Sequence, residues 1–433
     1  MLRAKHKTGL VFFPAFDWAI SPTHPEREER LLYTQDQVFE EGVFDIQGVV
    51  ELKPDPIRIK DIQRTHFCVP DVARVTTESH LISAGGAKAI GMAVLDGQID
   101  RGFALVRPPG HHAMRVVHGA RGFCNINIEA VMIEYLRQAY AIDRVAVVDT
   151  DCHHGDGTQD IYWHDPDTLF ISIHQDGRTL YPGSGFPVEF GGINAVGKTL
   201  NIPLPPHTSE EGFLYAMEHI VMPILDEFKP EIIVNSAGQD NHYTDPITNM
   251  NFSARGYADL TAMLKPDIAV LEGGYSIEGA LPYVNLGIVL AMAGVDYSRI
   301  KEPDYDPEGI ARQRRSQRPL KKSARSSRPS GTTAKPLRIN FWKKRILANA
   351  RAPSSTTPTA SANRRRNRSR FAPTAPAPFA STHHRIAVPA SWRSTFPAKH
   401  AAGARMPLTN GTTERIRDSS TGSFFRTAPR TSI

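Results

Sequence analysis

Short apolar runs alternate with helix-like segments through the first 300 residues, and this alternation constrains the fold more than any other feature. The expected strands are Gly9–Phe13, Gly102–Val106, Val145–Asp149, Leu169–His174, Leu200–Leu204, Ile232–Ser236 and Ile268–Leu271. The expected helices are Glu26–Glu41, Ala84–Leu95, Asn127–Ala139, Glu210–Glu227, Ser253–Leu264 and Leu281–Ala293. Most of these strands are continuous apolar runs, which is typical of strands buried on both faces of a parallel sheet. We therefore predict an α/β fold with a doubly wound, mostly parallel sheet and helices on both faces.

The distribution of charge divides the 433-residue chain into two parts. Residues 1–307 carry 24 Lys and Arg against 42 Asp and Glu, whereas residues 308–433 carry 27 against 3. The second part is dominated by Ser, Thr, Ala, Pro and Arg, and it has too few apolar residues to offset the entropy cost of folding. We predict one domain over 1–307 and a disordered basic tail over 308–433.

Three interpretations of the tail stay open. Basic clusters such as Arg364–Arg366 would bind nucleic acid through its phosphates. The tail would otherwise fold back on the acidic domain. The abrupt change of composition is also what translation of a shifted reading frame produces, and we favour this third interpretation.

Cysteine content and hydropathy exclude several classes of protein. Three cysteines, Cys68, Cys124 and Cys152, are too few for a disulfide scaffold of this length. No apolar run approaches the roughly 20 residues that span a bilayer. The run Leu10–Phe13 behind the basic N-terminus is too short for a signal peptide. We expect a cytoplasmic protein with reduced thiols and no membrane partner.

The densest cluster of reactive side chains directly follows an expected buried strand. Asp149, Asp151, His153, His154 and Asp156 all lie in this segment, and the carboxyl ends of strands are where open α/β sheets bind ligands. If the strand continues in an extended form, Asp149, Asp151 and His153 project to one side. Asp and His together suit a divalent metal ion, which would also neutralise the buried charge.

Three further motifs follow other expected strands. Arg107–His112 ends in two adjacent histidines, a residue type suited to proton transfer. Asp240 is positioned to supply a third metal ligand, with Asp245 as its rival. In Glu272–Tyr275, two glycines after an expected strand let the main chain and Tyr275 approach a ligand closely. The tyrosine hydroxyl would then stabilise an oxyanion.

Together these motifs resemble those of the histone deacetylase superfamily, which includes bacterial histone deacetylase-like amidohydrolases and acetylpolyamine amidohydrolases. The resemblance runs from about Pro22 to about Gly294. Its motifs stand in the family's order: Arg107–His112, Gly122–Cys124, Asp149–Gly157, Tyr181–Gly185, Ser236–Asp240 and Gly273–Tyr275. It implies a zinc-dependent deacetylase that hydrolyses the amide of an acetylated amine, either acetyl-lysine in a protein or an acetylpolyamine. Iron(II) stays open as an alternative to zinc.

The resemblance also implies individual roles. The implied metal ligands are Asp151, His153 and Asp240, and the implied catalytic residues are His111, His112, Asp149, Asp156 and Tyr275. In this assignment His112 is the main general acid and base. Asp149 orients His111, Asp156 orients His112, and Tyr275 polarises the carbonyl. Gly122, Phe123 and Tyr181 would wall a narrow substrate tunnel, with Arg30 as an internal arginine below it.

A monovalent cation site, for K⁺ or Na⁺, is implied close to the metal. It would be formed largely by main-chain oxygens of Asp149, Asp151, His153, Ser172 and Ile173.

Two features depart from the family pattern. Lys265–Asp267 joins helix to strand about one turn early, which either shortens the helix or displaces Tyr275. The family also continues with more helix where this chain changes composition.

Two alternative functions fit the sequence less well. A catalytically impaired acyl-amine binding protein, tethered to nucleic acid by the tail, is disfavoured by the complete set of motifs. Arginase-like enzymes share the expected sheet, but they bind two manganese ions through more carboxylates than this pattern offers.

Overall fold

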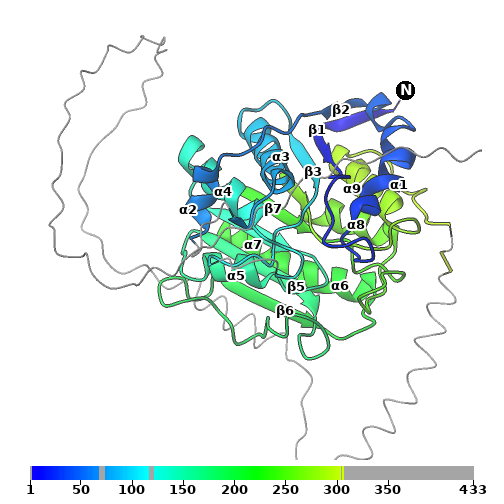
Figure 1. The fold of residues 1–433 in the computed structure, drawn as a ribbon. Helices are drawn as coiled ribbons and strands as arrows, with labels where there is room; N and C mark the ends of the chain where they lie inside the picture. Colours follow the sequence, from blue (N-terminus) through cyan, green and yellow to red (C-terminus); the bar gives the residue numbers. More distant parts are fainter. Residues whose placement is uncertain (1, 68–73, 117–120, 304, 307–433) are drawn as a thin grey trace, which may run out of the picture. The chain divides into compact units, whose positions relative to one another are not determined.

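A computed structural model describes residues 2–67, 74–116, 121–303 and 305–306. Its centre is a parallel sheet with the strand order β2-β1-β3-β8-β7-β4-β5-β6 (Figure 1). The strands are β1 Arg3–Phe13, β2 Gln47–Glu51, β3 Arg101–Val106, β4 Val145–Asp149, β5 Thr168–Gln175, β6 Thr199–Leu204, β7 Ile232–Ala237 and β8 Ile268–Leu271. The predicted doubly wound parallel sheet is confirmed.

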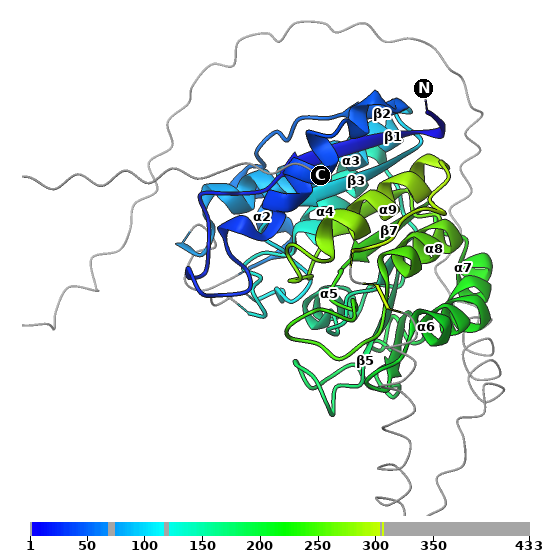
Figure 2. The same ribbon diagram turned by 90° about the vertical axis from the view of Figure 1, so that its right-hand side faces the viewer.

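Helices cover both faces of this sheet (Figure 2). One face carries α2 Ile59–Thr65, α3 Glu78–Leu95, α4 Ile128–Tyr140 and α5 Asp156–Tyr162. The other face carries α1 Leu32–Thr34, α6 Glu210–Ala216, α7 Met222–Phe228, α8 Ala254–Leu264 and α9 Leu281–Ala293.

The apolar strands divide their side chains between two cores, one on each face. In β4, Val145 and Val147 pack in the core with α3 and α4, whereas Ala146 and Val148 pack in the core with α8 and α9. Because successive strand residues point to opposite faces, a strand buried on both sides must be apolar throughout. This explains why the strands appear as continuous apolar runs.

Two of the predicted helices are interrupted. Glu26–Glu41 is a 3₁₀ turn Glu28–Leu31, the short α1 and a π-type segment Gln35–Phe39. Glu210–Glu227 becomes α6, a π-type segment Met217–Val221 and α7. Pro223, in the first turn of α7, has no N–H to continue an α-helical ladder from the preceding turn.

The early helix-to-strand junction is absorbed by the shorter α8. Lys265 ends the helix in the left-handed region at φ 52°. Asp267 then joins the sheet through two hydrogen bonds, from its N–H to the Ile233 carbonyl (3.0 Å) and from the Ile233 N–H to its carboxylate (2.7 Å). Strand β8 therefore starts in register with β7, and the connection does not displace Tyr275 from the pocket described below.

The predicted tail over 308–433 and Cys68 lie outside the described residues. Among the helices that are described, none has the length and apolarity needed to cross a membrane.

Candidate active site

A pocket of about 380 Å³ opens where the loops after β3, β4, β5, β7 and β8 converge. Its lining residues are His111, His112, Gly122, Phe123, His153, Leu180, Tyr181, Ile247 and Tyr275. Sequence analysis missed two of these, Leu180 and Ile247. Leu180 adjoins the predicted Tyr181, but nothing in the sequence around Ile247 distinguishes it from an ordinary loop residue.

Three buried side chains at the base of the pocket form a potential metal site. One ligand atom from each of Asp151, His153 and Asp240 lies within 4.8 Å of the others. The Nδ1 atom of His153 lies 2.7 Å from Asp240 Oδ2 and 3.2 Å from Asp151 Oδ1. Main-chain N–H groups fix both carboxylates, since Gly273 donates to Asp151 (2.7 Å) and Cys152 donates to Asp240 (2.8 Å). Two carboxylates and an imidazole in this arrangement fit a divalent cation with mixed oxygen and nitrogen ligands.

The chain after β4 brings these residues together by bending, so the expected extended strand end is wrong. The Asp151 N–H donates to the Asp149 carboxylate (3.0 Å), and the His153 N–H donates to the Asp151 carboxylate (2.8 Å). Each carboxylate thus turns the chain through a local hydrogen bond. Cys152 packs in the hydrophobic core, and burial raises the pKa of its thiol, which leaves it a structural residue.

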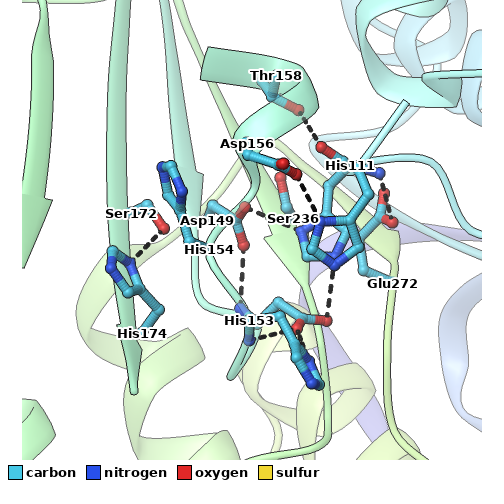
Figure 3. Close-up of polar contacts among 12 residues, drawn as sticks. His111, Asp149, His153, His154, Asp156, Thr158, Ser172, His174, Ser236 and Glu272 are labelled. Carbon is cyan, nitrogen blue, oxygen red and sulfur yellow. Dashed lines mark hydrogen bonds and ion pairs between the residues drawn. The ribbon is translucent and has the colours of Figure 1, made fainter. Parts of the chain in front are cut away.

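The tandem histidines each pair with the carboxylate expected to orient it. His111 Nδ1 lies 3.1 Å from Asp149 Oδ2 (Figure 3). His112 Nδ1 lies 2.8 Å from Asp156 Oδ1. Burial, together with the neighbouring His111, lowers the pKa of His112 to about 3. Burial also opposes protonation of His111, but Asp151 and Asp149 outweigh it and raise the pKa of His111 well above its ordinary value.

Asp156 begins α5 and has a second partner that sequence analysis missed. Arg121, whose side chain is 42% exposed, forms an ion pair with the other oxygen of Asp156. Burial opposes ionisation of Asp156, but the bonds from His112 and Arg121 outweigh it and hold its pKa below the usual range. Arg121 carried no signal because its partner lies 35 positions away in the sequence.

Tyr275 is held at the pocket by contacts on several sides. Its N–H donates to Asp245 (2.8 Å), its ring meets Phe123 edge-on at 5.6 Å, and the guanidinium of Arg30 lies 5.0 Å from its ring centroid. Asp245, the rival ligand, uses its two carboxylate oxygens on the N–H groups of Tyr275 and Ile247 and lies outside the metal cluster.

Arg30 is fully buried behind the site. It donates to the main-chain oxygens of Gly274 and Glu272 and forms an ion pair with Glu26 (2.7 Å), which also pairs with Arg107. The arginine therefore ties the N-terminal segment to the loop that carries Tyr275.

The five residues proposed for a monovalent cation lie on two neighbouring strands and the bend after β4. Asp149 and Ser172 are paired across β4 and β5, with Ile173 next along β5. Asp151 and His153, in the bend after β4, also belong to the potential metal site.

Comparison with known proteins places the chain in a family. Residues 69–286 match the sequence model of the histone deacetylase domain. A probable deacetylase from Archaeoglobus fulgidus is 45% identical over 337 residues, covering 71% of this chain and 92% of that protein. A histone deacetylase-like amidohydrolase from Pseudomonas aeruginosa is 38% identical, covering 52% of this chain and 60% of its own length.

Two further matches extend the comparison. The acetoin utilization protein AcuC of Staphylococcus xylosus is 36% identical, covering 48% of this chain and 56% of that protein. Among solved structures, the crystal structure of the HDA15 HD domain superposes with a TM-score of 0.61 at 28% identity, covering 67% of this chain and 89% of that one. The chain belongs to the histone deacetylase superfamily and is a hydrolase of the deacetylase class.

Proposed function

We propose that the protein is a zinc-dependent deacetylase that hydrolyses the amide of an N-acetylated amine. The observation that carries this proposal is the pocket itself, in which His111, His112 and Tyr275 face the potential metal ligand His153. Asp151, His153 and Asp240 would hold the zinc ion. When bound, zinc would supply Lewis-acid polarisation of the amide carbonyl and would lower the pKa of a water molecule.

The tandem histidines supply proton transfer. Because the Nδ1 atom of His112 is paired with Asp156, its Nε2 atom is left to accept a proton from the attacking water. A protonated histidine then donates to the leaving amine. Asp149 and Asp156 keep the two rings in fixed orientations.

Tyr275 is placed to stabilise the oxygen of the amide as it becomes negative. Its hydroxyl remains protonated, since burial raises the pKa of the phenol well above its ordinary value. The Tyr275 hydroxyl can therefore donate a hydrogen bond to the oxyanion throughout the neutral range.

The walls of the pocket favour a neutral acyl-amine arm. Phe123, Leu180 and Tyr181 present apolar surface, with Gly122 beside them. Acetyl-lysine in a protein and an acetylated polyamine both offer such an arm, and we propose these as the substrate class.

The test is release of free amine from an acetyl-lysine peptide and from an acetylpolyamine. Purified protein would be assayed with Zn²⁺, with Fe²⁺ under anaerobic conditions, and after chelation, beside Asp240→Ala. We expect release that depends on metal and is abolished in the variant. Folded, metal-loaded protein that releases no amine from either compound would overturn the proposal.

We further propose K⁺ or Na⁺ binding by the main-chain oxygens of Asp149, Asp151, His153, Ser172 and Ile173. Support comes from the pairing of Asp149 with Ser172 across β4 and β5. Titrating K⁺ and Na⁺ into protein in a buffer free of both should change its thermal midpoint. A midpoint that responds only to ionic strength would contradict this site.

We propose a cytoplasmic location, supported by the buried free thiols of Cys124 and Cys152. Fractionation of the producing cells tests it.

A further inference from the structure

A buried carboxyl group behind the histidines has no assigned role. Glu272 follows β8 and is fully buried. Its Oε2 atom accepts hydrogen bonds from the N–H groups of Gly110 (2.7 Å) and His111 (2.9 Å). Its Oε1 atom has no hydrogen-bond partner within the described part of the chain. The two main-chain N–H groups are thus the hydrogen-bond partners that the structure gives this carboxyl group.

The main chain of His111 is also held at its carbonyl group. The carbonyl oxygen of His111 accepts a hydrogen bond from the Thr158 N–H at 3.1 Å. The hydroxyl of Thr158 donates to buried Glu129 (2.7 Å), which also accepts from the hydroxyl of Ser236. Glu272 therefore holds the N–H side of His111, while Thr158 holds its carbonyl side.

We propose that Glu272 is a positioning residue that fixes the main chain of His111 and His112, and so sets where both imidazoles lie relative to the metal site. The inference rests on the proposed function. It differs from the pairing of the two rings with Asp149 and Asp156, because Glu272 acts on the backbone and not on the rings.

The loop that carries the histidines needs such an anchor. Residues 107–112 form neither helix nor strand, so no regular ladder of hydrogen bonds fixes them. The loop passes so close to α4 that a Cβ atom on Gly110 would lie 2.5 Å from the Ile128 nitrogen. A shift of ~1 Å in such a site can reduce the rate about a hundredfold.

The Glu272 carboxyl group interacts electrostatically with the His111 ring, but Arg30 does not pair with it. Arg30 approaches the residue, but it donates to the main-chain oxygen and not to the carboxylate. An apolar side chain in its place would leave two buried N–H groups without an acceptor, which is destabilising. The geometry assigns the carboxyl group to those N–H groups.

Three variants test the proposal. Glu272→Ala removes the acceptor, Glu272→Asp withdraws it by about 1.5 Å, and Glu272→Gln keeps a carbonyl oxygen that can accept both bonds. The control is Asp267→Ala, which removes a carboxylate acceptor of one main-chain N–H at the opposite end of β8.

We expect kcat of the Glu272→Ala variant to fall about a hundredfold, and kcat of Glu272→Asp to fall less. The KM and the metal content of both variants should stay close to those of the wild type. Gln should keep kcat within about fivefold, because it restores the acceptor. The control variant should lose stability but keep kcat.

A second readout separates failure of the anchor from failure of the proposed function. Amide hydrogen exchange of a peptide covering residues 107–113 should be faster in the Glu272→Ala variant than in the wild type. It should be unchanged in Glu272→Gln and in the control variant. If the wild-type protein releases no amine, the proposed function is wrong. Amide hydrogen exchange would still test whether Glu272 holds the main chain of the histidine loop. The proposal is overturned if Gln loses as much kcat as Ala, or if both Ala and Asp keep wild-type kcat. If Ala does not fold, Asp and Gln carry the same test.

Discussion

At the scale of single residues, the tyrosine hydroxyl offers the most direct test of the chemistry. Tyr275→Phe removes one oxyanion donor but keeps the ring that contacts Phe123 and Arg30. We expect kcat to fall by roughly 10²–10³, the usual effect of losing one such donor. Steady-state kinetics together with metal analysis would check this. Unchanged kcat in a metal-loaded variant would remove Tyr275 from the mechanism.

The glycines around the metal cluster give a test that does not depend on activity. A Cβ atom on Gly238 would lie 2.0 Å from Asp151 Oδ2, and one on Gly273 would lie 2.6 Å from the carboxylates of both Asp151 and Asp240. Contacts this short force the carboxylates to move. Gly238→Ala should therefore lower the zinc content of the purified protein, measured after dialysis against a buffer that contains trace zinc.

The matched control for that experiment is Gly279→Ala. A Cβ atom there meets only Ser276 Oγ at 3.5 Å, which is ordinary contact. Equal zinc content in wild type, Gly238→Ala and Gly279→Ala would show that Asp151 does not hold the metal.

At the scale of elements, the start of α8 shows how one cap stabilises the fold away from the site. Ser253 Oγ accepts from the Gly256 N–H (3.1 Å) and donates to Glu210 (2.8 Å), so it joins α8 to α6. Ser253→Ala should lower the free energy of unfolding by about 0.5–2 kcal/mol, as expected for a lost N-cap. Urea unfolding measures this, and kcat should stay unchanged. An equal loss of kcat would mean that α8 is coupled to the pocket.

Elements whose signal is local could be predicted from the sequence. The strands buried on both faces, such as β4 and β8, were found to the residue because their apolar runs are uninterrupted. Strand β2 and helix α2 were missed, since a half-buried edge strand and a seven-residue helix show too little periodicity.

The site divides in the same way. Motifs that are compact in the sequence pointed to the pocket, whereas Arg121 was missed and Glu272 was part of a motif but had no role. Their partners, Asp156 for Arg121 and Gly110 and His111 for Glu272, are adjacent only once the sheet brings separate loops together. No local pattern encodes such contacts.

At the scale of the whole molecule, buried histidines outside the pocket make the stability depend on pH. Burial lowers the pKa of both His66 and His80 to about 4. In the unfolded chain these rings bind protons near pH 6.5. The unfolded state therefore holds more protons between pH 6.5 and 4, and stability falls as the pH falls through this window.

Each of these histidines contributes a slope of up to about 1.4 kcal/mol per pH unit within that window. Urea unfolding between pH 7.5 and 5 would measure the combined slope. His66→Asn should be less stable at pH 7.5 but show a shallower dependence on pH. A variant with the wild-type slope would rule out His66 as a source of the effect.

The division of charge at residue 307 leads to a test of the tail. The residues proposed for the pocket and the metal site all lie within the described residues and before position 307. A chain ending at Pro307 should therefore keep the kcat and KM of the full chain. A large loss of kcat would show that residues 308–433, which carry 27 Lys and Arg, complete the enzyme.

The same truncation distinguishes the three interpretations of the tail. A nucleic-acid arm predicts DNA binding by the full chain that weakens steeply with salt and is lost on truncation, because phosphate contacts release counterions. A tail folded on the acidic domain predicts instead that truncation changes KM at low salt and not at high salt, since exposed charges are screened. A shifted reading frame predicts neither change. It also predicts that the encoding DNA, translated in another frame past codon 307, continues with apolar residues at helical spacing. Finding no such continuation would leave the choice to the DNA-binding and KM experiments.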